Sequence, residues 1–157
     1  MVNNGRERAE EDRPTEGRFV GSEHRFPLRV YFEDTDLSGI VYHANYLRFM
    51  ERARSNMLRL AGVDQRAAWE AGGGAYAVAD LRIRYRAPAR LDDVLVVRSR
   101  LTELRAASVA IHQRVMRGEA ILAEAEVVAA LVSPNGRPRR QPAEWVARYR
   151  KLLGRDE

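Results

Sequence analysis

The most regular hydrophobic pattern in the chain lies between Tyr42 and Ala61. Five apolar residues recur there at steps of four, three, four and three positions: Tyr46, Met50, Ala53, Met57 and Leu60. Because an α-helix turns once every 3.6 residues, this spacing places all five on one side of a helix. Gly62 follows as a stop signal. The pattern therefore predicts a long amphipathic helix with one face built for burial.

After residue 74 the pattern changes to an alternation of apolar and polar positions, which is typical of strands with one buried face. The predicted strands of the whole chain are 25–32, 75–86, 94–104, 107–117 and 120–132. A short helix from Asp64 to Trp69 and a terminal helix from Pro142 to Leu153 complete the predicted elements. We expect an α+β fold, in which about five largely antiparallel strands pack on one main helix. Such a small sheet leaves an exposed edge, which favours self-association.

The size of the chain suits one domain, since 157 residues with 45% hydrophobic content can build a single core. Residues 1–24 are polar and charged without periodicity, so we expect a disordered segment there and a domain at residues 25–153. No apolar run approaches the roughly 20 residues that span a bilayer, and the N-terminus lacks the apolar core of a signal peptide. We therefore expect a cytoplasmic protein.

The positive charge of the chain is unevenly distributed. The net charge is +5, and residues 1–24 hold four arginines against six acidic residues, so residues 25–157 carry +7. A basic domain fits nucleic acid, the phosphates of coenzyme A or a merely soluble arginine-rich surface. Few aromatic residues and no recognised nucleic-acid motif speak against nucleic acid. The absence of cysteine excludes disulfides, thiolate catalysis and cysteine-ligated metals.

Candidate chemistry lies where the first strand leads into the long helix. Asp36 is followed by the turn residues Leu37-Ser38-Gly39, and Tyr42 and His43 stand at the expected helix start. The first four N–H groups of a helix have no intrahelical acceptor, so they can polarise a substrate carbonyl while a carboxylate acts beside it. This pairing indicates acyl transfer or hydrolysis, although Asp36 could also simply cap the turn or the helix.

The run YFEDTDLSGIVYHANYLRFMERAR at residues 31–54 resembles the hotdog-fold acyl-CoA thioesterases, especially the Tol-Pal system-associated family and more distantly the 4-hydroxybenzoyl-CoA thioesterases. A second, weaker likeness is PARLDDVL at residues 88–95. The resemblance implies a hotdog fold and an acyl-CoA substrate without metal or cofactor. It also implies active sites at the interface of a homodimer or homotetramer. Related proteins suggest acyl carrier protein or phospholipid-synthesis enzymes as partners, and a place peripheral to the inner membrane.

The resemblance assigns roles to two residues of the junction. Asp36 matches the acidic residue that these enzymes use either as nucleophile or as general base for water, and the sequence leaves both routes open. His43 would polarise the thioester oxygen through its backbone N–H, while its imidazole would orient Asp36 or assist proton transfer. The more distant group carries tyrosine at the position of His43, which favours the backbone role. A partly exposed histidine at a helix start is the plainer alternative.

Five further residues are candidates for substrate binding. Gly39 permits the turn that brings Asp36 near the helix, and Tyr42 is an aromatic neighbour of the site or a core residue. Arg82, Arg84 and Arg90 either meet the phosphates of coenzyme A or line a solvated strand face.

Other chemistries receive less support from the sequence. Acidic residues around Asp36 with His43 could suggest a metal, yet the chain has no HExxH spacing and too few oxygen ligands for a hard-cation loop. The absence of GxSxG and of a glycine-rich phosphate loop argues against a serine hydrolase and a nucleotide hydrolase. A hotdog hydratase or dehydratase, or a non-catalytic adaptor that binds coenzyme A at the cell envelope, remain the alternatives to a thioesterase.

Overall fold

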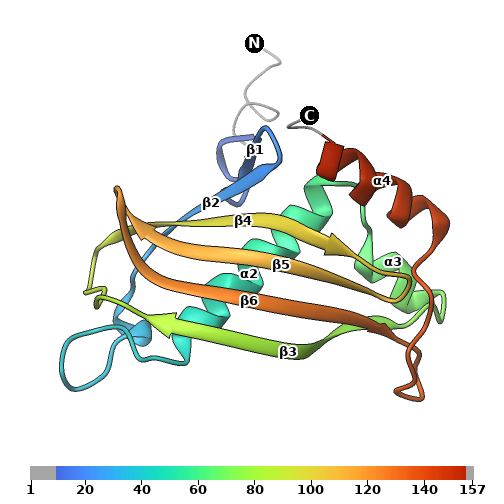
Figure 1. Ribbon diagram of the computed structural model, residues 1–157. Helices are drawn as coiled ribbons and strands as arrows, with labels where there is room; N and C mark the ends of the chain where they lie inside the picture. Colours follow the sequence, from blue (N-terminus) through green and yellow to red (C-terminus); the bar gives the residue numbers. More distant parts are fainter. Residues whose placement is uncertain (1–9, 155–157) are drawn as a thin grey trace, which may run out of the picture.

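The computed structural model describes residues 10–154, in which six antiparallel strands form one sheet. The order across the sheet is β1-β2-β4-β5-β6-β3. The strands are β1 (Arg18–Val20), β2 (Glu23–Arg29), β3 (Ala75–Tyr85), β4 (Val94–Leu104), β5 (Ser108–Arg117) and β6 (Ala120–Val132). The helices are the 3₁₀ turn η1 (Phe32–Asp34), α2 (Asn45–Leu60), α3 (Gln65–Glu70) and α4 (Ala143–Leu153). Figure 1 shows α2 crossing one face of the curved sheet.

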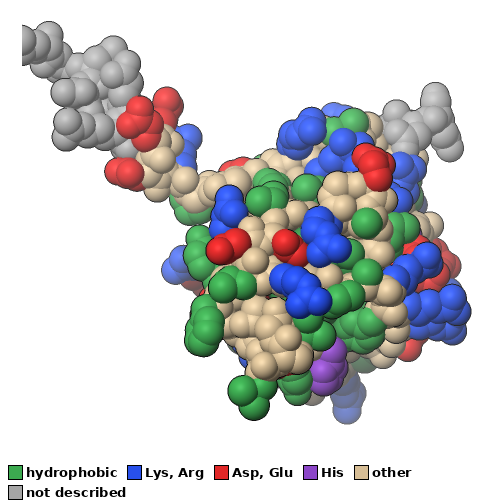
Figure 2. Space-filling model, turned by 90° about the vertical axis from the view of Figure 1, so that its left-hand side faces the viewer, with side chains coloured by type: hydrophobic (Ala, Val, Ile, Leu, Met, Phe, Trp, Pro, Cys, Tyr) green, Lys and Arg blue, Asp and Glu red, His purple; other side chains and the backbone are tan. Residues whose placement is uncertain are grey.

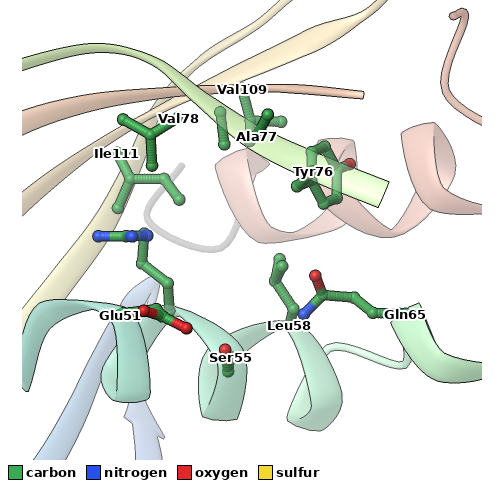
Figure 3. Close-up of a pocket in the computed structure, with 11 residues that line it drawn as sticks. Glu51, Ser55, Leu58, Gln65, Tyr76, Ala77, Val78, Val109 and Ile111 are labelled. Carbon is green, nitrogen blue, oxygen red and sulfur yellow. The ribbon is translucent and has the colours of Figure 1, made fainter. Parts of the chain in front are cut away.

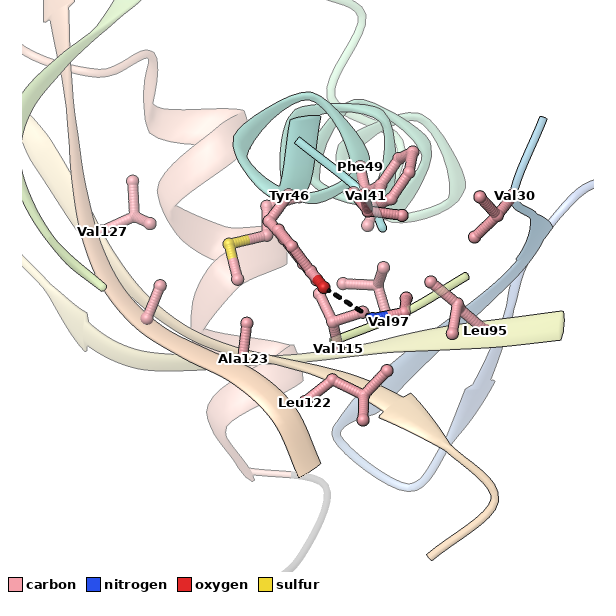
Figure 4. Packing of buried hydrophobic residues seen from close by; sticks show 14 residues of the cluster. Val30, Val41, Tyr46, Phe49, Leu95, Val97, Val115, Leu122, Ala123 and Val127 are labelled. Carbon is pink, nitrogen blue, oxygen red and sulfur yellow. Dashed lines mark hydrogen bonds between the residues drawn. The ribbon is translucent and has the colours of Figure 1, made fainter. Parts of the chain in front are cut away.

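The long amphipathic helix is confirmed, and its apolar face forms the centre of the core. Tyr46, Met50, Ala53 and Met57 are buried, whereas Leu60 at the end of the helix is 42% exposed, so its predicted burial is wrong. Figure 4 shows side chains of α2 packed against residues of the sheet such as Val97 and Val115. The apolar stripe of the helix and the inner face of the sheet thus bury each other.

A second cluster of buried residues closes the far end of α2. Trp145 and Tyr149 of α4 pack there with Met57 and Leu58. The hydroxyl groups of Tyr76 and Tyr149 are hydrogen-bonded at 2.7 Å, which pairs α4 with β3. Among the described residues, no helix is long and apolar enough to cross a membrane.

The predicted boundary of the disordered N-terminal segment at residue 24 is wrong. Residues 18–20 form β1, and β2 begins at Glu23, where Glu23 and His24 are buried. Asn56 on α2 holds this segment, because its side-chain oxygen accepts a hydrogen bond from the Gly17 backbone N–H and lies 2.8 Å from His24 Nε2. Polar groups that look solvated in the sequence are therefore satisfied by a distant helix. The prediction for residues 1–9 falls outside the described residues.

The remaining elements follow the predicted pattern with small differences. Strands β4 and β6 have the predicted bounds, while the sheet gains β1 and therefore has six strands instead of about five. The main helix begins at Asn45 rather than Tyr42, because the Asn45 backbone N–H closes a turn onto the Tyr42 carbonyl at 2.8 Å. The short helix is capped by Asp64, whose side chain accepts a hydrogen bond from the Ala67 N–H.

Candidate active site

The loop between η1 and α2 carries Asp36 on a tight turn. The Gly39 N–H donates to the Asp36 carbonyl at 3.0 Å, and the Asp36 N–H donates to the Ile40 carbonyl at 3.0 Å. Gly39 has a φ of 77°, a left-handed conformation that glycine adopts without strain. The predicted role of Gly39 in shaping this turn thus agrees with its backbone.

The Asp36 carboxylate is exposed and held in its ionised form. Its Oδ1 accepts a hydrogen bond from the Ser38 backbone N–H at 2.8 Å and another from the Ser38 hydroxyl. These hydrogen bonds lower the pKa of Asp36 below its ordinary value, and the charge of His43 contributes in the same direction. An ionised carboxylate at neutral pH is what a nucleophile or a general base needs.

The start of α2 presents backbone donors beside this carboxylate. No side chain caps the helix at its N-cap residue Ala44. Within the part of the chain that the structure describes, the backbone N–H groups of His43 and Ala44 donate no hydrogen bond. Free N–H groups at a helix start carry partial positive charge, so they can stabilise a developing oxyanion.

Asp36 and His43 line one cleft of about 430 Å³ between α2, the end of β3 and the loop that follows it. The lining residues are Asp36, Ile40, Val41, His43, Tyr46, Tyr85, Arg86, Ala87 and Pro88. The walls are therefore mostly apolar with a few polar groups, as in small-molecule sites.

Two tyrosines that sequence reasoning did not assign to the site support this cleft. The Tyr46 hydroxyl accepts a hydrogen bond from the buried Ala89 N–H at 3.0 Å, and burial raises the pKa of Tyr46. The Tyr85 hydroxyl donates to the His43 carbonyl at 2.8 Å and so orients the helix start. Their rings meet edge to face with centroids 5.5 Å apart. The sequence favoured a core or interface role over a catalytic one for Tyr46, and Tyr85 showed only the alternation of a strand.

Asp34 has a supporting role. It is buried, its carboxylate accepts hydrogen bonds from the Tyr31 N–H and the Asn45 side chain, and its carbonyl accepts from the Tyr42 N–H. These bonds tie η1 to the start of α2. Over residues 10–154, no group of three or more histidine and acidic side chains is arranged to hold a metal ion.

The other predicted binding residues lie at different distances from the cleft. Tyr42 is 47% exposed and its ring packs against His43, with centroids 4.5 Å apart. Arg90 pairs through its backbone with Ile40, next to the cleft. Arg82 and Arg84 line a neighbouring hollow of about 270 Å³ with His112 and Glu124, and Arg86 lines both this hollow and the cleft. The structure thus brings Asp36 and His43 together and leaves Arg82 and Arg84 elsewhere.

A further hollow of about 290 Å³ lies between the second half of α2 and the beginning of β3. Figure 3 shows Leu58, Tyr76, Val78 and Ile111 around this hollow. It lies along the same helix as the Asp36 cleft and against the opposite end of β3, so the two hollows are separate within one chain.

Two apolar side chains in the segment that leads to Asp36 are in contact with solvent. Phe32 is 82% exposed and Tyr31 is 63% exposed. Figure 2 shows a face of the molecule on which hydrophobic side chains lie exposed among basic and acidic ones. Exposed apolar side chains mark a surface that meets a ligand or another chain only where they form a contiguous patch.

Comparisons with known proteins agree with this geometry. The family model described as the thioesterase-like superfamily matches residues 30–149. The acyl-CoA thioester hydrolase YbgC of Escherichia coli O6:H1 is 43% identical over 129 residues, which covers 81% of this chain and 96% of that protein.

Two crystal structures of bacterial thioesterases have the same fold. A probable thioesterase from Bartonella henselae is 39% identical, with a TM-score of 0.72 over 76% of this chain and 99% of its own. A thioesterase from Thermus thermophilus, complexed with coenzyme A and Zn, is 30% identical, with a TM-score of 0.70 over 83% of this chain and 95% of its own. The expected hotdog fold is confirmed, and the chain belongs to the thioesterase-like superfamily.

Proposed function

We propose that this chain hydrolyses acyl-CoA thioesters to a carboxylic acid and free coenzyme A at the cleft beside Asp36. The single observation that carries the assignment is the ionised Asp36 carboxylate in one apolar cleft with the uncapped start of α2. Family membership and the 43% identical acyl-CoA thioester hydrolase support the same reaction. The geometry favours a thioesterase over the hydratase and adaptor alternatives, because a carboxylate stands next to an oxyanion site.

The thioester carbonyl oxygen would lie against the free N–H groups of His43 and Ala44, which stabilise the negative charge that develops there. In the general-base route, Asp36 removes a proton from water, the oxygen of that water attacks the carbonyl carbon, and the C–S bond breaks. The thiolate of coenzyme A then takes up a proton. In the nucleophilic route, Asp36 attacks the carbonyl carbon itself, and the C–S bond breaks to release the thiolate of coenzyme A, which takes up a proton. Water then hydrolyses the resulting mixed anhydride to the free acid and the Asp36 carboxylate. Both routes use the same ionised carboxylate.

The His43 imidazole has a secondary role in this proposal. Its charge favours the ionised form of Asp36, and its ring packs between Tyr42 and Tyr85. The backbone of the same residue is held by the Tyr85 hydroxyl. We therefore assign the oxyanion contact to the backbone and the orientation of Asp36 to the imidazole.

Basic residues at the mouth of the cleft are the candidates for the coenzyme A phosphates. Arg86 lines the cleft while its guanidinium group is ion-paired with Glu124 at 2.6 Å, and Arg90 adjoins the cleft through the backbone of Ile40. Arg82 and Arg84 line the neighbouring hollow, which shares Arg86 with the cleft. We accordingly place the phosphates nearer Arg86 and Arg90.

A second copy of the chain would complete the site. Strand β3 lies at the edge of the sheet, and its apolar residues Val78, Leu81 and Tyr85 are between 37% and 52% exposed. Pairing of two β3 edges would cover them and enclose the open cleft. The homodimer or homotetramer is a prediction. The partners, acyl carrier protein or phospholipid-synthesis enzymes, are also predictions, as is the cytoplasmic location near the inner membrane.

The test is turnover of a panel of short, long and aromatic acyl-CoA thioesters by the purified chain. Asp36→Asn keeps the shape of the side chain and removes its charge, so kcat should fall by about a hundredfold or more. Asp92→Asn is the matched control, because Asp92 lies outside the cleft and its left-handed φ of 68° suits asparagine. A folded Asp36→Asn variant with near-normal kcat would reject the assignment, and binding of coenzyme A without any turnover would favour the adaptor.

A further inference from the structure

The two reactive parts of the proposed site lie at opposite ends of one short loop. Asp36 follows η1, whereas His43 and Ala44 directly precede α2. Between them the chain folds back on itself, since the Tyr42 N–H donates to the Asp34 carbonyl at 2.9 Å. The distance from the Asp36 carboxylate to the helix start therefore depends on what holds this loop against α2.

A buried hydrogen bond between two side chains joins the loop to the helix. Asn45, the first residue of α2, donates from its Nδ2 to Asp34 Oδ1 at 2.9 Å. Asp34 is 3% exposed and Asn45 is 9% exposed, so water hardly competes for this bond. The second oxygen of the same carboxylate accepts the Tyr31 N–H at 2.8 Å. The carboxylate of Asp34 thus connects the residue before η1 with the first residue of α2.

The same bond keeps the Asp34 carboxylate away from the free N–H groups of the helix start. An acidic side chain next to a helix start ordinarily caps it by accepting from these N–H groups. Here both oxygens of Asp34 accept from other donors, those of Asn45 and Tyr31, and no side-chain bond caps α2 at its N-cap residue. The N–H groups of His43 and Ala44 therefore stay available for a substrate oxygen.

We propose that Asp34 and Asn45 are positioning residues for the hydrolysis of the thioester. Their hydrogen bond sets where the N–H groups of His43 and Ala44 lie relative to the Asp36 carboxylate. Neither Asp34 nor Asn45 lines the cleft, so both act through the backbone of the helix start. The inference rests on the proposed function, because it concerns the alignment of two groups that act on one thioester. A misplacement of about 1 Å between reacting groups can cost about a hundredfold in rate.

Exchange of the two side chains tests this role. In Asn45→Asp the donor is lost, and the new carboxylate faces that of Asp34, so the two charges repel each other. Addition of Asp34→Asn restores a donor, because the amide at position 34 donates to the new carboxylate while its oxygen still accepts the Tyr31 N–H. Asn45→Asp should lower kcat about tenfold to a hundredfold with little change in KM, since the interaction it disturbs acts in the transition state. The double variant should recover most of the loss.

Asn45→Ala is the second variant, because it removes the donor without adding a charge and alanine favours a helix. It should lower kcat in the same direction, and Asp34→Asn should not rescue it, since no partner is left. Asn56→Asp is the matched control further along α2, where the Asn56 amide donates to the Glu16 carboxylate. It likewise places two carboxylates together, but away from the cleft. It should lower the urea midpoint and leave kcat of the folded chain unchanged.

The amide signals of His43 and Ala44 in a two-dimensional NMR spectrum provide a readout without substrate. These signals should shift in Asn45→Asp and return toward their wild-type positions when Asp34→Asn is added. Asn56→Asp should leave them in place. Signals that stay in place in both Asn45→Asp and Asn45→Ala would show that the bond does not position the helix start, which overturns the inference.

The kinetic outcomes separate this inference from the proposed function. A wild-type chain that hydrolyses no acyl-CoA thioester would reject the proposed function. An active wild-type chain whose kcat is unchanged in both Asn45→Asp and Asn45→Ala would overturn this inference alone. A folded double variant that remains as slow as Asn45→Asp would overturn it as well, because the exchanged pair can form the same bond.

Discussion

Removing one oxygen atom from Tyr46 should destabilise the fold measurably. The Tyr46 hydroxyl accepts the Ala89 N–H at 3.0 Å, and Ala89 is completely buried. Tyr46→Phe therefore leaves a buried N–H without an acceptor, which costs about 1–3 kcal/mol. A domain of this size has a free energy of unfolding of about 5–15 kcal/mol, so the loss is a large fraction of the total.

Tyr85→Phe is the matched control, because it deletes the same atom from a neighbouring ring in the same cleft. The Tyr85 hydroxyl donates to the His43 carbonyl in an exposed position, where water can replace it. We expect its free energy of unfolding to change by no more than about 0.5 kcal/mol. The two variants thus differ mainly in whether a buried group loses its partner.

The assay is urea unfolding followed by far-ultraviolet circular dichroism, at equal protein concentration because an oligomer would link stability to concentration. In thermal unfolding, Tm should fall by about 2–4 °C for each kcal/mol lost. If Tyr46→Phe is as stable as the wild-type chain, or no less stable than Tyr85→Phe, then the Ala89 N–H finds another acceptor and the reasoning is refuted.

Three further predictions concern the helix start, the buried histidine and the N-terminal strand. His43→Ala keeps the backbone N–H and should lower kcat less than Asp36→Asn does, measured on the same thioester. Burial lowers the pKa of His24 in the folded chain, whereas in the unfolded chain the pKa is about 6.5. As the pH drops below about 6.5, the unfolded chain therefore binds a proton at His24 more readily than the folded chain does, and the free energy of unfolding should fall. His24→Gln should flatten this dependence of the urea midpoint between pH 7 and pH 5. Deletion of residues 1–22 should lower the urea midpoint, because it removes β1 and the Gly17 bond to α2.

Each of these predictions has a control and a contrary result. Equal losses for His43→Ala and Asp36→Asn would show that the imidazole takes a direct part in the reaction. His112→Gln controls for the partly buried histidine on the outer face, and a slope unchanged by His24→Gln would remove His24 as the cause. Deletion of residues 1–9 is the control for the truncation, and an unchanged midpoint after loss of residues 1–22 would show that β1 contributes nothing.

The sequence by itself determined the elements whose signals are local. The 3.6-residue period of the apolar residues located α2, and alternation located β4 and β6 with their observed bounds. The junction of Asp36 with His43 was also visible, because both residues lie in the one segment that connects β2 to α2. Residues that are close in sequence keep their neighbourhood in the fold, so the centre of the candidate site could be predicted.

Only the tertiary structure decided which residues from distant segments join this junction. Strand β1 is too short to show a period, and its attachment depends on Asn56, about 40 residues away along the chain. The alternation of β3 indicated that Tyr85 and Arg84 face opposite sides, but not which side meets α2. Packing of Tyr85 against the helix start brings it into the cleft and turns Arg84 to the outer face. Faces of a strand are equivalent until one of them is buried, and burial is a property of the whole fold.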